Sequence, residues 1–108
     1  MGVQYWIDSY SIIFPSSKSI SNLTIPQVVA QIKVFEQRSC RGYLWFYSDE
    51  TDLAPSSYDS QNECIELHYN LKHMHAIMDM LRNEDSIYVY YKDPSSAHIG
   101  CGREPVGE

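Results

Sequence analysis

The chain lacks any long hydrophobic run. None of its apolar stretches approaches the ~20 residues that cross a bilayer as a helix. The first residues also lack a basic region followed by an apolar segment and a cleavage site of small residues, so no secretory signal is expected. The sequence therefore predicts a soluble, cytoplasmic protein with no membrane partner.

Basic charge is scarce as well. Eight Lys and Arg stand against fourteen Asp and Glu, which gives a formal net charge of −6. A protein that grips a nucleic-acid backbone needs a basic surface to neutralise phosphates, so nucleic acid is not an expected partner. The acidity fits a basic protein partner, and it also fits plain solubility.

Cysteines are few. The chain has three, Cys40, Cys64 and Cys101; this odd number without dense spacing says little about disulfides. Reduced thiols in a cytoplasmic domain are the simpler interpretation.

A metal site would have to come from two local pairs, Cys64 with His68 and His98 with Cys101. Zinc needs three or four nitrogen or sulfur ligands that converge, so both pairs would have to meet in the fold. Their spacing matches no strong zinc signature, such as two paired CxxC motifs. We therefore expect no metal and no other cofactor.

Motifs that name a reaction are missing too. Gly100-Cys101-Gly102 is too short for a phosphate-binding loop and has no helix after it. A nucleophilic cysteine would need a base and a third group to orient that base, and Cys64 or Cys101 with a histidine is the nearest approach. Free cysteines in small domains are more often inert. The sequence favours a non-enzymatic role and assigns no catalytic residue.

What the chain does contain is alternating apolar and polar segments bounded by turn residues. These segments predict strands, because successive side chains of a strand point to opposite faces. The predicted strands are 3–14, 43–47, 64–69 and 86–92, with 97–101 as an extra edge strand.

Two amphipathic helices are predicted between these strands. The first runs from Thr24 to Ser39, with a capping threonine, an early proline and an apolar face formed by Ile25, Val28, Ile32 and Phe35. The second covers 71–82 and is capped by Asn70. Its predicted buried face carries Leu67, Leu71, Met74, Ile77, Met78 and Leu81.

The resulting order is strand, helix, strand, strand, helix, strand. It predicts an α+β fold, a two-layer ferredoxin-like (βαββαβ) sandwich with both helices on one face of an antiparallel sheet. We expect residues 1–101 to form a single domain and 102–108 a flexible tail. The long 49–62 connection is predicted to be mobile or functional.

Aromatic residues supply the predicted binding surface, since nine tyrosines are many for so short a chain and tyrosine is enriched at protein interfaces. The helix-free face of the sheet should carry several of them. A second predicted surface is a stripe along the second helix formed by Tyr69, His73, Ala76 and Met80. This stripe is either an interface or an incidental apolar surface. The predicted partner-binding residues are the anchors Tyr47, Tyr88 and Tyr90, the acidic rim Asp49, Glu50 and Asp52, and the stripe residues Tyr69, His73 and Met80.

These features favour a small acidic protein-binding module, of the inhibitor or immunity type, that occludes a basic surface of a nuclease, a toxin or a similar protein. The alternative is a small-molecule, nucleotide-like binding protein or enzyme that uses the aromatic sheet face for stacking. We also predict a homodimer, because two apolar surfaces remain after one core is built.

Overall fold

The computed structural model describes residues 2–14, 28–48 and 53–102 of the 108-residue chain. Eight strands and one α-helix are assigned in these ranges. They are β1 (Val3–Ile7), β2 (Ser9–Ile13), β3 (Val28–Glu36), β4 (Ser39–Tyr47), β5 (Ser57–Asp59), β6 (Cys64–Asn70), α1 (Met74–Asn83), β7 (Ile87–Asp93) and β8 (Ser96–Cys101).

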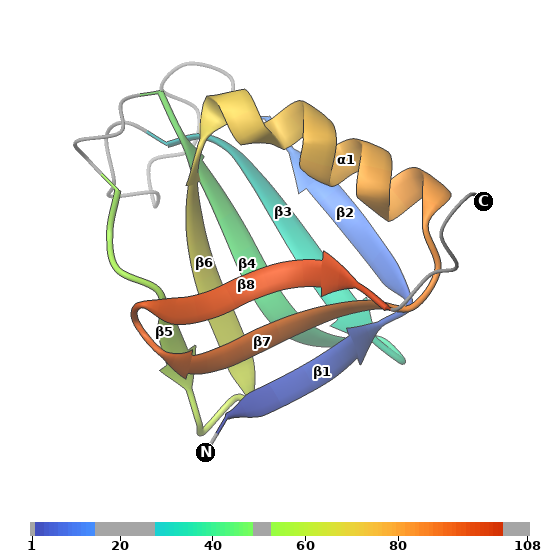
Figure 1. Cartoon of the computed structure of the whole chain (residues 1–108), viewed down its shortest axis with the longest axis vertical. Helices are drawn as coiled ribbons and strands as arrows, with labels where there is room; N and C mark the ends of the chain where they lie inside the picture. The colour runs from blue at the N-terminus through green and yellow to red at the C-terminus, as the bar shows by residue number, and fades with distance from the viewer. Residues whose placement is uncertain (1, 15–27, 49–52, 103–108) are drawn as a thin grey trace.

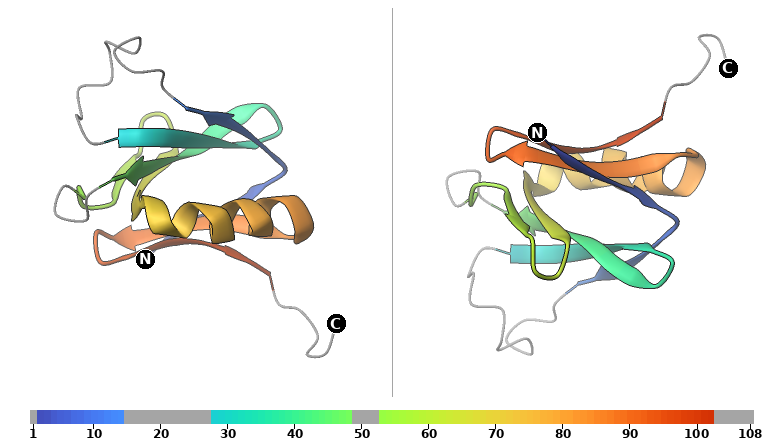
Figure 2. Two further views of the ribbon diagram at one scale, coloured as in Figure 1. Left: turned by 90° about the horizontal axis from the view of Figure 1, so that it is seen from above. Right: turned by 90° about the horizontal axis from the view of Figure 1, so that it is seen from below.

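Two sheets form the two layers seen in Figures 1 and 2. The first has the order β1-β7-β8 and the second the order β2-β3-β4-β6-β5. Neighbouring strands run antiparallel except β4 and β6, which are parallel. The helix α1 lies along one side of the two layers, and its buried Met74, Ile77 and Leu81 join the common core.

One extended segment serves both sheets, because β1 pairs with β7 while β2 pairs with β3. Asp8 lies between the two halves. Its N–H donates to the Phe35 carbonyl oxygen (2.9 Å), and its Oδ2 accepts from the Gln37 N–H (2.8 Å). In β1 the odd-numbered side chains point to the core, and after Asp8 the even-numbered side chains of β2 do so. Both halves therefore turn apolar side chains to the core. Those side chains are Tyr5 and Ile7 from β1 and Tyr10 and Ile12 from β2.

The core is built from alternate residues of the long strands, as expected when one face of each strand is buried. Its fully buried strand residues include Ala30, Ile32, Val34, Leu44, Phe46, Ile65 and Val89. Gly42 lets β4 approach its neighbours closely. A Cβ at that position would lie 2.9 Å from Val34 Cγ2 and 3.2 Å from the Ile65 carbonyl oxygen.

The ferredoxin-like prediction is wrong, because the structure is mostly strand, with two sheets and one short helix. The described part of the predicted first helix forms β3, the turn after it and the first residue of β4; Thr24–Gln27 lies outside the described residues. Val28, Ile32 and Phe35 match a helical period, yet Ala30, Ile32 and Val34 match a period of two equally well. β-Branched residues favour the strand, and pairing with β2 on one side and β4 on the other completes it.

The second helix is confirmed, but it begins later than predicted. Asn70 Oδ1 accepts from the Lys72 N–H (3.0 Å), and this cap serves a short 3-10 turn, Leu71–His73, that precedes α1. The prediction that Leu71 is buried is wrong, since its side chain is 41% exposed. The 3-10 turn rotates Leu71 out of phase with the buried face of α1.

The remaining strand predictions mostly hold. The predicted strands at 64–69, 86–92 and 97–101 are confirmed as β6, β7 and the edge strand β8, and 43–47 lies inside the longer β4. The first strand is extended but divides at Asp8, and the 49–62 connection contains an unpredicted strand, β5. The prediction of a purely antiparallel sheet is wrong at the β4–β6 pair.

Candidate interaction surface

A row of aromatic rings lies on the outer face of the β1-β7-β8 sheet. Val89 of β7 is fully buried, so its neighbours Tyr88 and Tyr90 point away from the core. The strand register places Trp6 opposite Tyr88 and His98 opposite Tyr90. We call Trp6, Tyr88, Tyr90 and His98 the aromatic face; it belongs to the sheet drawn in front in Figure 1.

The rings of the aromatic face contact one another in sequence. Trp6 and Tyr88 meet edge to face with centroids 5.5 Å apart, and Tyr88 meets His98 in the same way at 5.5 Å. Tyr90 follows at 5.3 Å from His98. The Tyr88 hydroxyl lies 3.2 Å from His98 Nε2, within hydrogen-bonding distance. Edge-to-face pairs of this kind stabilise one another, which favours this arrangement of the rings before any partner binds.

Glycine makes room for these rings. A Cβ at Gly100 would lie 3.0 Å from the Tyr88 hydroxyl oxygen, and a Cβ at Gly2 would lie 2.6 Å from the ring of Tyr90. The rings of both tyrosines therefore pack against glycine backbone, and this contact leaves them half-buried. Trp6 remains 49% exposed, and His98 is exposed as well. The aromatic face thus presents rigid rings that keep much of their surface in water.

An acidic pocket of about 420 Å³ lies at the end of the sheet formed by the last residue of β1 and the first residue of β7. Asp8, Glu84 and Asp85 line it, and its described lining residues include no Lys or Arg. Ile7 and Ile87 also line it; their side chains pack against the core, so the pocket opens on the opposite side of the sheet from Trp6 and Tyr88. The pocket combines negative charge with an apolar floor, which suits the long apolar stem and charged head of a lysine or arginine.

A second hollow, of about 260 Å³, lies between α1, β6 and β8. The structure brings the predicted helix stripe together here, because the hollow is lined by Tyr69, His73, Ala76, Ile77, Met80 and Ile99. Tyr69 accepts a hydrogen bond from the Ile99 N–H (3.3 Å), which ties β6 to β8. Burial raises the pKa of the Tyr69 phenol, so the hydroxyl stays neutral.

The other predicted anchors are placed differently. Tyr47 is fully buried, with its hydroxyl 2.8 Å from His68 Nδ1, and so offers no surface to a partner. The acidic rim Asp49, Glu50 and Asp52 lies outside the described residues.

The four candidate metal ligands are distributed over separate sites. Cys64 contacts Cys40, His68 contacts Tyr47, and His98 belongs to the aromatic face, while Cys101 packs against the core. Within the described ranges, no three His, Cys, Asp or Glu side chains are grouped to hold a metal ion.

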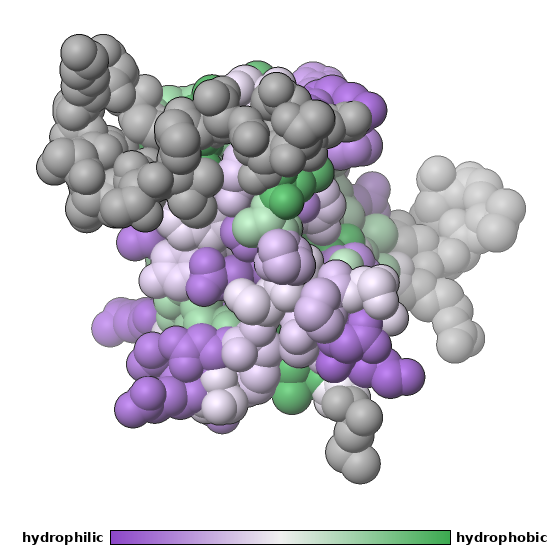
Figure 3. Space-filling view, turned by 90° about the vertical axis from the view of Figure 1, so that its left-hand side faces the viewer, coloured by the Kyte–Doolittle hydropathy of each residue, from purple (hydrophilic) through white to green (hydrophobic). Residues whose placement is uncertain are grey.

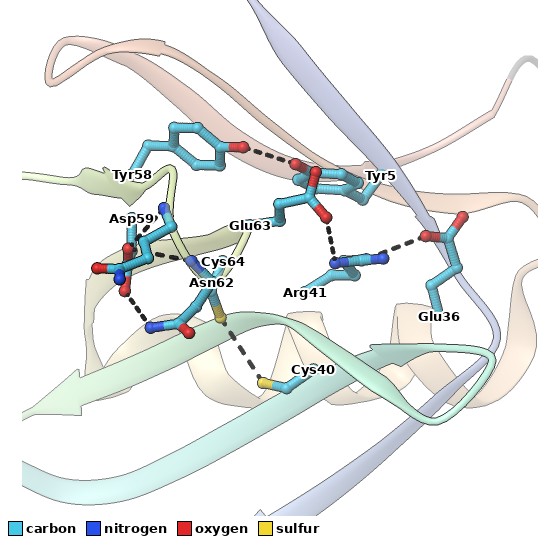
Figure 4. A network of polar contacts seen from close by, with 10 residues as sticks. Tyr5, Glu36, Cys40, Arg41, Tyr58, Asp59, Asn62, Glu63 and Cys64 are labelled. Carbon is cyan, nitrogen blue, oxygen red and sulfur yellow. Dashed lines mark hydrogen bonds and ion pairs between the residues drawn. The ribbon is translucent and has the colours of Figure 1, made fainter.

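A polar network holds the end of the sandwich where β1, the β3–β4 hairpin and the segment from β5 to β6 meet (Figure 4). Arg41 pairs with Glu36 (Nε–Oε1, 3.1 Å) and with Glu63 (Nη1–Oε1, 3.3 Å), and its guanidinium lies 5.0 Å from the centre of the Tyr5 ring. Tyr5 in turn meets the Tyr58 hydroxyl at 2.7 Å. Burial and this hydrogen bond raise the pKa of Tyr5, so its hydroxyl keeps its proton. We interpret the network as structural.

Figure 3 views the side of the molecule at the left of Figure 1. There the coloured, described residues are mostly hydrophilic or weakly coloured, with only small separate hydrophobic areas. This side offers no continuous apolar surface among those residues.

The partner-binding residues predicted from the sequence did not include Trp6, His98 or Asp8. Alternation along β7 indicates that Tyr88 and Tyr90 share a face, and that part was accessible from the sequence. The neighbours Trp6 and His98 depend on the register of β1 and β8 against β7, which no local pattern specifies.

Comparison of the chain with protein-family models, curated proteins and solved structures found no match. In the part of the chain that the structure describes, no helix has the length and apolar character needed to cross a membrane. The case for a function therefore depends on the aromatic face and the acidic pocket at the end of the same sheet.

Proposed function

We propose that this chain is a protein-binding module that docks its aromatic face on a basic surface of another protein and blocks that surface, as an inhibitor or immunity-type protein does. The observation that carries the proposal is the row of four partly exposed rings on a sheet face that no other described element covers. Rigid aromatic side chains are typical anchors of protein interfaces, because they bury a large area at little cost in conformational entropy.

The shape of the surface favours a protein over a small molecule. Small ligands are usually bound in concave sites that bury most of their surface. The four rings line neither the acidic pocket nor the hollow beside α1. An open row of rings suits a partner that brings its own complementary surface.

The charge distribution indicates the character of that partner. The acidic pocket lies at the end of β1 and β7 nearest Trp6 and Tyr88, on the core side of these strands, whereas Lys92, the lysine of β7, lies toward the other end of that strand. A partner docked on the rings would reach the pocket with a lysine or arginine that extends around this end of the sheet. The net charge of −6 would speed the encounter with a basic protein, and added salt would slow it.

The test is affinity capture from a lysate of the source organism, with wild-type chain and three variants as bait. Trp6→Ala and Tyr88→Ala remove rings of the aromatic face, whereas Tyr43→Ala removes a ring that stacks on Trp45 in the other sheet. We expect wild type and Tyr43→Ala to retain the same strongly basic protein. The two face variants should bind it at least about tenfold more weakly, as loss of an interface anchor does.

Two outcomes would contradict this proposal. One is the recovery of no protein at physiological salt, and the other is equal retention by all four baits when circular dichroism shows that all are folded. A thermal-shift screen of nucleotides checks the alternative. Stabilisation by several degrees in wild type, absent in Trp6→Ala, would favour a stacked small ligand instead.

A further inference from the structure

Two cysteines face each other on the outer side of the larger sheet, away from the aromatic face. Cys40 in β4 and Cys64 in β6 have their Sγ atoms 3.7 Å apart (Figure 4). They are twenty-four positions apart in sequence, on parallel neighbouring strands. The distance is close to van der Waals contact, so small side-chain rotations would bring the sulfurs to the ~2.05 Å of a disulfide.

A β-bulge produces this arrangement. Cys40 pairs with Phe35 and Gly42 pairs with Val34, which leaves Arg41 as an extra residue in β4. The extra residue reverses the alternation, so that Arg41 turns toward Tyr5 while Cys40 turns toward Cys64. The bulge thus places a thiol where regular alternation would have placed arginine.

Both cysteines line a pocket of about 490 Å³ on this side of the sheet. Cys40 is half-buried, whereas Cys64 is only 5% exposed. A reagent that enters from solvent therefore reaches Cys40 first. Asp59, Glu66 and Arg41 also line the pocket. Because Arg41 is paired with Glu36 and Glu63, the pocket still disfavours anionic reagents.

We propose that Cys40 and Cys64 form a dithiol redox site, which small neutral or cationic disulfides oxidise to an intramolecular disulfide. The Cys40 thiolate attacks one sulfur of the reagent, which forms a mixed disulfide and expels the first thiol. Cys64 then gives its proton to solvent, and the resulting thiolate attacks Cys40 Sγ and expels the second thiol. Two electrons and two protons pass from the pair to the reagent, which leaves as two thiols.

The order of the two steps follows from the surroundings of the thiols. Burial and the neighbouring Cys40 raise the pKa of Cys64 to about 12, so Cys64 stays protonated and does not attack free reagent. Once Cys40 carries the mixed disulfide, its sulfur is held next to Cys64. The second attack is then intramolecular and gains from proximity.

Oxidation would also change the stability of the fold. The bond would close a loop through the whole connection from β4 to β6, including β5. A cross-link over a loop of that length restricts the unfolded chain, so the melting temperature should rise by roughly 10 °C. This site acts independently of the aromatic face, and its failure would leave the proposed function standing.

The experiment treats the folded, reduced chain with cystamine, a cationic disulfide, and in parallel with oxidised glutathione, an anionic one. All samples carry Cys101→Ser, which removes the third thiol and serves as the background. Intact mass should show a product lighter by two hydrogens, and peptide mapping should join Cys40 to Cys64. Cystamine should react about tenfold faster than oxidised glutathione.

Single variants separate the two roles. With Cys64→Ser the reaction should stop at the mixed disulfide on Cys40, and with Cys40→Ser the folded chain should take up almost no reagent. The proposal is overturned if the folded chain forms no internal disulfide, or if Cys64 reacts as fast in Cys40→Ser as in the unfolded chain. A faster reaction with oxidised glutathione would equally contradict it.

Discussion

The burial of one side chain, His68, makes the free energy of unfolding depend on pH. It is half-buried on β6, and its Nδ1 lies 2.8 Å from the Tyr47 hydroxyl. Burial lowers the pKa of His68 below its ordinary value of 6.5, because the charged imidazolium loses water, while Glu66 opposes the shift. The unfolded chain therefore binds this proton more readily than the folded chain does.

The free energy of unfolding should consequently fall under mildly acidic conditions. The stabilising effect of neutral His68 is complete above the unfolded pKa of about 6.5, and it is lost as the pH falls from there toward the lower folded-state pKa. Urea titrations between pH 7.5 and pH 5 measure this decline.

Two variants assign the decline to one histidine. His68→Gln should flatten the slope of stability against pH in this range, whatever its effect on absolute stability. His75→Gln changes an exposed residue of α1 and should leave the slope as in wild type. If both variants keep the wild-type slope, another group is responsible.

Individual residues differ in how far the sequence could place them. The outward direction of Tyr88 and Tyr90 follows from alternation along β7, a local pattern. The Cys40–Cys64 contact could not be predicted, because it needs both a bulge in β4 and a parallel partner strand. Tyr47 was predicted to be a surface anchor, yet it is fully buried, because the sequence does not show which outward positions are covered.

At the scale of the elements, two leucines in and just before α1 can be compared directly. Leu81 is 8% exposed and packs in the core, whereas Leu71, in the 3-10 turn before the helix, is 41% exposed. Leu81→Ala should lower the free energy of unfolding by roughly 2–5 kcal/mol, since it leaves a cavity. Leu71→Ala should cost less than about 1 kcal/mol. Denaturant midpoints at unchanged slope measure both, and equal losses would show that the face of the helix is misassigned.

The strand β3 shows where sequence patterns are no longer sufficient to predict an element. The segment Val28–Glu36 satisfies a helical and a strand period together, so periodicity alone cannot decide between them. Pairing with β2 on one side and β4 on the other makes this segment a strand. A local sequence pattern does not contain these pairings. β6, β7 and β8 were predictable because each is short, alternating and bounded by turn residues.

On the scale of the whole molecule, the aromatic face also predicts self-association. Monomers rarely leave large apolar patches in water, and a two-fold axis lets one patch pair with its own copy. The edge of β8 is less suitable as a seam, because the Ile99 N–H is already donated to Tyr69. We therefore expect the free chain to be a homodimer through its aromatic face, which a basic partner displaces.

Light scattering at micromolar concentration measures this directly. Wild type should show about twice the 12.5 kDa of one chain. Tyr88→Glu should give the mass of one chain, because it places a charge in the middle of the seam. Tyr43→Glu, on the other sheet, is the matched control and should remain dimeric. A wild-type mass near 12.5 kDa would contradict the dimer.

The pairing of β1 with β7 sets the time at which the binding surface comes into existence. Trp6 leaves the ribosome eighty-two residues before its partner Tyr88. Contacts between segments so far apart in sequence form slowly, after local structure. A nascent chain can thus assemble strands of the larger sheet before the aromatic face exists, so neither partner binding nor self-association begins until β7 and β8 have been synthesised.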